Sequence, residues 1–225
     1  DVIMAFGILQ EKTVLSFYQS GSGMIRILCS SIAPNPEDAG HFVAGEGGPT
    51  EIINASAYSV ILSGKVSLYR EEKCGTPNVA IHEILHALGF DHNNNKDSIM
   101  YPVTECWQEL DDYIITEISR LYKDDPLPDL LISKLEANRT GRYLNFDIVV
   151  GNYGLKESSG ALLVVSVEGD SIREINLGDI PIGTRKILSV QNLRLPRNSQ
   201  IILFKIETNE KELSKDNNFA ELNLE

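Results

Sequence analysis

Hydrophobic and polar positions follow different patterns in the two halves of the chain. In the first half, apolar residues recur at near-helical spacing over Val2–Tyr18, Val79–Leu88 and Asp111–Tyr122, which predicts three helices. Asn78 and Gly89 are expected to cap the middle helix at its two ends. Residues 32–51, rich in Pro and Gly, are predicted to form a long loop. The expected strands are Met24–Cys29, Tyr58–Leu62 and Lys65–Tyr69, the last two separated by a hinge at Ser63 and Gly64.

The second half contains short apolar runs separated by Gly, Asn, Asp and Pro. This spacing is typical of an antiparallel β-sandwich. The segment Asp124–Asp129 is acidic, holds two prolines and cannot continue a helix. We therefore expect a domain boundary there, with an α+β domain over residues 1–125 and an all-β, immunoglobulin-like sandwich over residues 126–225. The strand-like runs include Tyr143–Val150, Ala161–Val167, Arg185–Val190 and Ile201–Ile206.

Composition and charge narrow the function classes. Hydrophobic residues make up 42% of the 225 residues and charged residues 23%, as in soluble globular proteins. No apolar run approaches the roughly 18 residues that a membrane span needs. Residues 1–125 hold 8 Lys and Arg against 18 Asp and Glu, a net charge of -10 out of -12 for the whole chain. Such a charge repels a phosphate backbone, so nucleic acid is not an expected partner.

Three of the four histidines fall within residues 82–92. On a helix, His82 and His86 project from the same face and can bind one ion together. Glu83 lies about 100° around the helix from His82, close enough to act on a ligand of that ion. A turn at Gly89 would bring His92 back as a third ligand. Three neutral imidazoles leave one position open, which is typical of a catalytic zinc site.

The segment Ser98–Pro102 supports this interpretation. It resembles the Met-turn of the metzincin metallopeptidases, and His82–His92 matches their H-E-x-x-H-x-x-G-x-x-H pattern. Within that clan, residues 1–123 most resemble the matrixins, the matrix metalloproteinase family. The resemblance implies a mixed twisted sheet with an active-site helix, one catalytic Zn²⁺ and Met100 as an apolar floor beneath the ligands. Without the resemblance, Met100 is a core methionine, which is compatible with that role.

Three features depart from the family pattern. Only His41 remains after the three zinc ligands, so we expect no second, structural zinc site. The loop Gly45–Gly48 could bind Ca²⁺, but we favour a solvated acidic face as its explanation. Thr104 stands where the family has a tyrosine in the wall of its specificity pocket, so substrate preference does not carry over.

The three cysteines leave two interpretations open for Cys74. The string Lys73–Asn78 is similar to the cysteine switch of matrixin propeptides, but it lies eight residues before His82 rather than ahead of the domain. The alternative is a disulfide between Cys74 and Cys106, which suits an oxidising compartment and a secreted or cell-surface location. Cys29 would then be a buried free thiol. The chain begins at Asp1 and shows no signal peptide.

The second half resembles the CARDB-type immunoglobulin-like modules of archaeal and bacterial surface proteins. The resemblance rests on Asp129–Ile132, Phe146–Gly154 and Asp216–Asn218. It implies adhesion to a cell-surface or cell-wall component, or positioning of substrate, and a simple spacer is the alternative. No His, Cys or Trp occurs after residue 125, so catalysis there is not expected.

These observations together predict a zinc-dependent endopeptidase that hydrolyses peptide bonds. Glu83 would act as general base and then general acid. By the resemblance, a protein or peptide substrate would pair with an exposed sheet edge, for which Tyr58–Leu62 is the candidate and an internal strand the alternative. The competing function is a surface adhesion or binding protein whose metzincin-like domain binds zinc without catalysis.

Overall fold

The computed structural model of the chain describes residues 1–36, 42–55 and 58–224. The chain divides into two compact units, one formed by Asp1–Ile53 with Ile61–Asp125 and the other by Asn54–Val60 with Pro126–Glu225. Each unit has a hydrophobic core of its own and is described by itself. His41, the histidine outside the proposed zinc ligands, lies outside the described residues.

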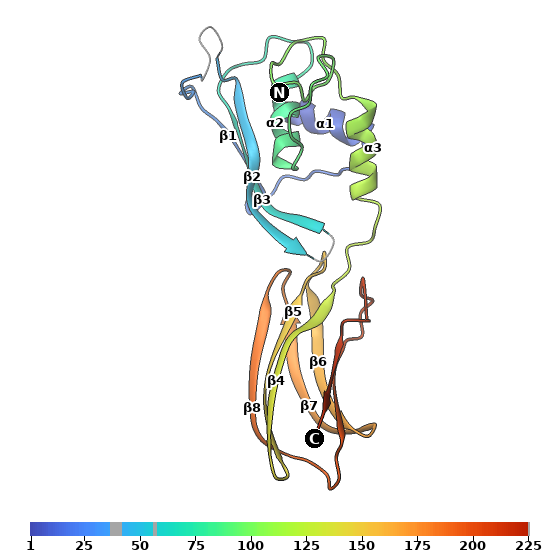
Figure 1. Ribbon diagram of the computed structural model, residues 1–225. Coiled ribbons are helices and arrows are strands. Elements are labelled where there is room, and N and C mark those ends of the chain that lie inside the picture. The colour runs from blue at the N-terminus through green and yellow to red at the C-terminus, as the bar shows by residue number, and fades with distance from the viewer. Residues whose placement is uncertain (37–41, 56–57, 225) are drawn as a thin grey trace. The chain divides into compact units, whose positions relative to one another are not determined.

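Among the described residues, the first unit contains three helices and one three-stranded sheet. The strand order is β1-β3-β2, and β1 runs parallel to β3 with Ile25 opposite Gly64. The Tyr69 amide bonds to the Ala44 carbonyl, and the Thr50 hydroxyl bonds to that of Ser63. Residue numbers rise along β2 as those of the partners fall along β3, so this pair is antiparallel. The elements are α1 (Val2–Lys12), β1 (Ile25–Cys29), β2 (Gly45–Ala55), β3 (Tyr58–Leu68), α2 (Asn78–Ala87) and α3 (Asp112–Leu121) (Figure 1).

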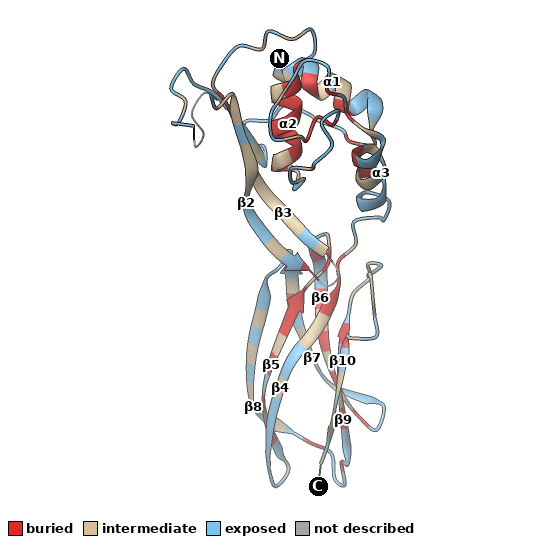
Figure 2. Cartoon of the chain, turned by 45° about the horizontal axis from the view of Figure 1, so that its top comes forward, coloured by how far each residue is buried: buried red, intermediate tan, exposed pale blue. Residues whose placement is uncertain are grey.

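Helix α2 lies at the centre of this unit. Eight of its ten residues are buried, and Figure 2 shows it mostly in the colour of buried residues. Helix α1 packs against it through Ala5 and Leu9, and α3 contributes Ile114 and Ile118 to the same core. The apolar spacing of these helices explains which faces turn inward. The burial holds α2 firmly, which is what a ligand-bearing helix requires.

Three sequence predictions in this unit are wrong in part. The first helix ends at Lys12 rather than Tyr18, because Thr13 is extended and its hydroxyl donates to the Leu9 carbonyl at 2.6 Å. The predicted loop over residues 32–51 becomes strand β2 from Gly45 onward. Strand β3 is continuous through the expected hinge at Gly64, where a Cβ atom would lie 3.2 Å from the Ala87 carbonyl oxygen. That glycine allows close packing on α2 instead of a bend.

Of the two predicted ends of α2, the structure contradicts the N-cap and confirms the turn after the helix. Asn78 is the first helical residue and not the N-cap, and its side chain makes no capping bond. The free amide of Val79 donates instead to the Glu72 carboxylate at 2.8 Å. At the other end, Gly89 has a φ of +92°, so the predicted turn is confirmed. The predicted third helix is also confirmed, with Asp111 as N-cap accepting from the Ile114 amide.

The second unit consists of two antiparallel sheets packed on each other. Their strand orders are β10-β9-β6-β7 and β4-β5-β8 over the described residues. The rings of Phe146 and Phe204 meet between the sheets with centroids 4.9 Å apart. The predicted runs fall within β5, β6, β8 and β9, whereas β4 and β7 were not anticipated. The strands are β4 (Leu130–Thr140), β5 (Tyr143–Asn152), β6 (Ser158–Val167), β7 (Asp170–Ile180), β8 (Arg185–Arg194), β9 (Ile201–Glu207) and β10 (Phe219–Asn223).

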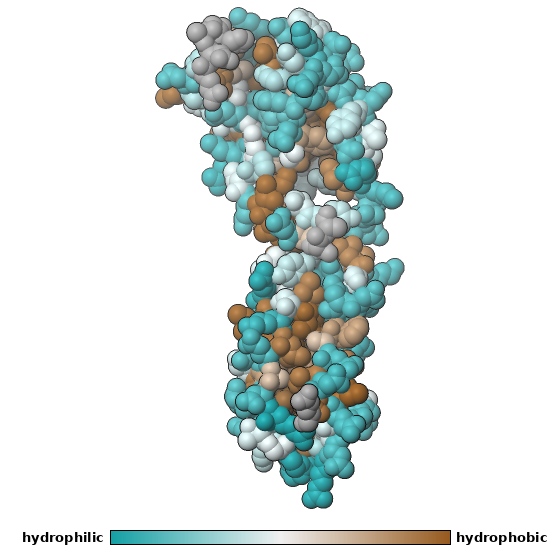
Figure 3. Space-filling view, viewed as in Figure 1, coloured by the Kyte–Doolittle hydropathy of each residue, from teal (hydrophilic) through white to brown (hydrophobic). Residues whose placement is uncertain are grey.

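The surface of the chain is largely hydrophilic in one view (Figure 3). Hydrophilic residues cover most of the face drawn in Figure 3, and hydrophobic residues form separate patches on it. Among the described residues, no helix is both long enough and apolar enough to cross a membrane.

Candidate metal centre

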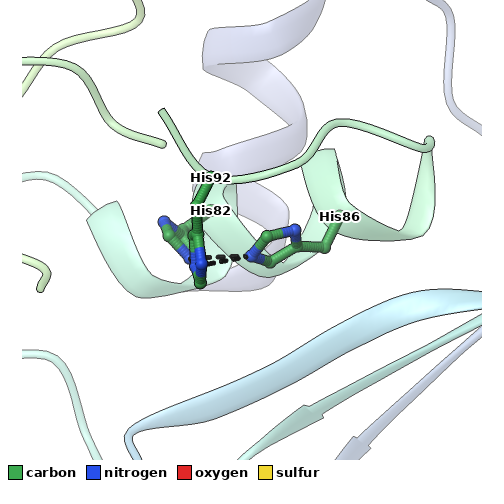
Figure 4. A group of neighbouring side chains, drawn as sticks. All are labelled: His82, His86 and His92. Atoms are coloured by element: carbon green, nitrogen blue, oxygen red, sulfur yellow. Dashed lines mark hydrogen bonds between the residues drawn. The ribbon is translucent and has the colours of Figure 1, made fainter. Parts of the chain in front are cut away.

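Three histidine side chains converge on one point beside α2. His82 and His86 lie one turn apart on the helix, and the turn at Gly89 brings His92 back toward them (Figure 4). The Nε2 atom of His82 is 3.0 Å from that of His86 and 3.1 Å from that of His92. The His86 and His92 Nε2 atoms are also 3.1 Å apart. The structure therefore brings together all three histidines that the sequence predicted as ligands.

Backbone carbonyls fix which ring nitrogens face the centre. Nδ1 of His82 donates to the Ile99 carbonyl at 2.6 Å, and Nδ1 of His86 donates to the Phe90 carbonyl at 2.7 Å. In the neutral rings the proton is then on Nδ1, so the two Nε2 atoms face each other with lone pairs and no proton between them. A shared cation would relieve this repulsion. A metal-binding histidine normally donates its other ring N–H to a carbonyl or carboxylate, as His82 and His86 do here.

The spacing of the nitrogens suits zinc. Zn–N bonds of about 2.0–2.1 Å in tetrahedral geometry separate two ligand nitrogens by roughly 3.4 Å. The observed 3.0–3.1 Å is close to this value. Burial lowers the pKa of His82 to about 4 and also lowers the pKa of His92, where the charge of His86 acts in the same direction. Both shifts favour the neutral ring, the form that a metal binds.

Glu83 follows His82 on α2, and its carboxyl group is not one of the three clustered ligands. Its side chain is 7% exposed, and burial raises its pKa to about 7, helped by the negative charge of Glu46. Glu46 lies on β2 and accepts a hydrogen bond from the Tyr69 hydroxyl. A carboxyl group with a pKa near neutrality can both accept and release a proton at physiological pH.

Met100 is buried in the same core as α2. It follows Ile99, whose carbonyl holds His82, and its own carbonyl accepts from the Asn93 amide at 2.9 Å. Its amide donates to the Ser98 hydroxyl at 3.1 Å. The segment around Met100 is therefore bonded both to the first ligand and to the residue that follows the third.

Sequence reasoning missed a buried amide network beside the start of α2. The Asn78 side chain donates to the Glu105 and Gln108 carbonyls at 2.9 and 3.3 Å. Gln108 in turn donates to the Val103 carbonyl at 2.9 Å and accepts from the Glu105 amide at the same distance. These bonds fix the segment that contains Thr104. No periodicity marks either residue, so the sequence offered no signal for them.

The cysteines resolve into one disulfide and one free thiol. Cys74 and Cys106 form the expected disulfide, with Cα atoms 5.2 Å apart, so the cysteine-switch interpretation of Cys74 is wrong. The prediction of a buried Cys29 is also wrong, since its free thiol is exposed. Strand β1 lies at the edge of the sheet, and its last two residues are exposed.

Two further expectations concern the sheet. Gly45–Gly48 belong to β2, so the proposed calcium-binding loop is a strand. Tyr58–Leu62 belong to β3, which pairs with β1 only from Gly64 to Leu68, so β1 does not flank this stretch. In the described part of the sheet, β2 is an outer strand, and Gly45 lies against Glu83. The edge nearest to the catalytic candidate is therefore β2.

Comparisons with known proteins found a matching family model and similar solved structures. The family model of the matrixins, the M10 peptidases, matches residues 2–123. None of the curated proteins matches the chain. Two solved structures of a CARDB domain from Pyrococcus furiosus are similar to 44% of the chain. A crystal structure with di-metal ions is 16% identical with 87% of its chain covered, and a solution structure is 17% identical with 95% covered, each at a TM-score of 0.38.

Proposed function

Because the chain belongs to the matrixin family of metallopeptidases, we propose that it is a zinc-dependent endopeptidase with His82, His86 and His92 as zinc ligands. The observation that carries this proposal is the set of three Nε2 atoms within 3.0–3.1 Å of one another, two of them oriented by backbone carbonyls. Bound there, Zn²⁺ supplies a Lewis acid that polarises the peptide carbonyl and acidifies a water molecule.

Glu83 is the proposed general base and acid. Its carboxylate accepts the proton of the attacking water and then, as the carboxylic acid, donates it to the leaving amine. In the metal-free chain, burial raises the pKa of the Glu83 carboxyl group to about 7. Met100 supports the ligands from the core and takes no part in the proton transfers.

The proposed binding surface for substrate is the outer edge of β2. Its neighbour on one side is β3, and the strand order leaves its other side without a partner among the described strands. An extended peptide can form main-chain hydrogen bonds with such an edge. Gly45 brings this edge next to Glu83, so a peptide bound there would have its scissile bond near the proposed base.

We also propose an extracytoplasmic location and a separate role for residues 126–225. The Cys74–Cys106 disulfide supports an oxidising compartment. The peptidase function is assigned to residues 1–125, and the sandwich to attachment at a cell-surface or cell-wall component or to substrate positioning.

Cleavage of denatured casein by the purified, zinc-loaded chain tests the proposed activity. Phenanthroline should abolish cleavage, added Zn²⁺ should restore it, and Glu83→Gln should lower the rate by about 10²–10⁴ while one zinc per chain is retained. Glu136→Gln, which alters an exposed glutamate paired with Lys134 in the second unit, is the matched control and should leave the rate unchanged. Cleavage that survives both the chelator and Glu83→Gln would refute the mechanism. One bound zinc without cleavage would favour the adhesion function instead.

A further inference from the structure

Two glycines of β2 lie in contact with Glu83. A Cβ atom at Gly45 would lie 2.6 Å from the Glu83 Cγ atom and 3.0 Å from its Oε1 atom. A Cβ atom at Gly47 would lie 2.1 Å from the Glu83 carbonyl oxygen and 2.8 Å from its Cα atom. Contacts under 3.0 Å essentially never occur for real Cβ atoms. Neither position therefore accepts a side chain without movement of Glu83 or of the strand.

The requirement for glycine is specific to these two positions. Residues two apart on a strand share a face, so Gly45 and Gly47 both turn toward α2. Gly48 is the next residue of the same strand, and a Cβ atom there would meet nothing within 4 Å. Flexibility of the segment does not explain this difference, because none of the three has a positive φ. The close approach of β2 to α2 does explain it.

We propose that Gly45 and Gly47 are positioning residues for Glu83, an inference that rests on the proposed peptidase function. Gly45 leaves the space in which the Glu83 side chain lies and so selects the conformer of its carboxyl group. Gly47 lets the backbone of β2 touch the backbone of α2 and so sets the distance between the substrate-binding edge and the base. Together they fix the position of the Glu83 carboxyl group relative to the outer edge of β2.

The two glycines should respond differently to substitution by alanine. At Gly45 the new methyl group meets the middle and end of a side chain, which can rotate away. Gly45→Ala should therefore leave the fold nearly as stable but displace the carboxyl group. At Gly47 the methyl group meets backbone atoms, which cannot rotate away. Gly47→Ala should therefore push β2 from α2 and destabilise the first unit.

Steady-state kinetics and thermal unfolding of the zinc-loaded full chain separate these effects. A misplacement of about 1 Å in a catalytic group can reduce the rate roughly 100-fold. Gly45→Ala should lower kcat by about that factor and change KM by less than about threefold, because the strand edge is kept. Gly47→Ala should lower Tm by about 4 °C or more and raise KM as well. Gly48→Ala is the control for stability, and Gly21→Ala, at a turn with open space, is the control for activity.

A crystal structure of Gly45→Ala makes the inference independent of the proposed activity. It should show the Glu83 carboxyl group rotated away from its position beside residue 45, with one zinc still bound. A wild-type chain that cleaves no peptide refutes the peptidase function, and the structure and the Tm values then decide the inference alone. Unchanged kcat in Gly45→Ala, an unmoved Glu83 side chain, or equal Tm values for Gly47→Ala and Gly48→Ala would each overturn it.

Discussion

Replacing Glu83 by Gln should stabilise the metal-free protein at alkaline pH. The pKa of Glu83 rises from 4.5 to about 7 because folding buries its carboxyl group. Ionising this group is therefore harder in the folded chain than in the unfolded chain, and one pKa unit corresponds to 1.36 kcal/mol. The difference amounts to about 3 kcal/mol of lost stability above pH 7, when the folded chain must carry the buried charge. Gln has nearly the same shape and no charge to bury.

The buried charge lowers the stability of the wild type relative to Glu83→Gln, and this difference grows as the pH rises. Well below pH 4.5 the carboxyl group is protonated in both states and the penalty is absent. Between pH 4.5 and 7 the unfolded chain releases its proton and the folded chain does not, so the folded state becomes progressively less favourable relative to Glu83→Gln. The advantage of the variant should thus grow from near zero at pH 4.5 to about 3 kcal/mol at pH 8.

Urea unfolding of chelator-treated protein measures this advantage. Trp107 is the single tryptophan of the chain, and its fluorescence reports on the first unit alone. The free energy of unfolding of wild type and Glu83→Gln would be compared at pH 5, 6, 7 and 8, with Glu136→Gln as the control. Equal stabilities at pH 8, or an advantage that shrinks as the pH rises, would refute the reasoning.

Three further predictions concern the same unit. His92→Ala should lower zinc content from one ion to well below one per chain by atomic absorption, because two imidazoles and solvent hold zinc poorly; full zinc content would exclude this residue as a ligand. The double substitution of Cys74 and Cys106 by Ser should destabilise the unit by about 3–4 kcal/mol in urea, since the disulfide closes a separation of 32 residues. Asp111→Ala removes the acceptor for the Ile114 amide and should reduce the stability of the unit by about 1 kcal/mol, whereas Asp111→Asn should retain most of it.

Features determined by neighbours in the sequence could be predicted well. The spacing of His82 and His86 on a helix and the turn at Gly89 are local, and the structure confirms that geometry. The helix predicted over Asp111–Tyr122 and found as Asp112–Leu121 is local too. In each case the relevant contact joins residues within one or two helical turns, so periodicity and residue type suffice.

Strand β2 shows why other features escaped prediction. Its Gly45–Pro49 stretch has the composition of a turn, and local propensity favours a loop. The strand forms there because β3 pairs with it and because α2 lies against Gly45 and Gly47, contacts that join residues 13 or more positions apart. The same holds for Asn78, whose position suggested a cap but whose amide is bonded to the carbonyls of Glu105 and Gln108. Tertiary contacts overrode the local signal in both cases.

The orientation of His82 depends on both local sequence and tertiary contacts. Its place on α2 follows from local sequence, but the carbonyl that holds its Nδ1 belongs to Ile99, 17 residues later. Ile99 is held in turn through its amide, which donates to the Glu109 carbonyl at 2.8 Å. The ring tautomer that exposes Nε2 to a metal therefore depends on a chain of backbone hydrogen bonds. That chain ends at Glu109, next to Gln108 of the buried amide network, which no sequence pattern marked. Ligand identity can be read from the motif, whereas the preorganisation of the ligand is a property of the segment that follows it.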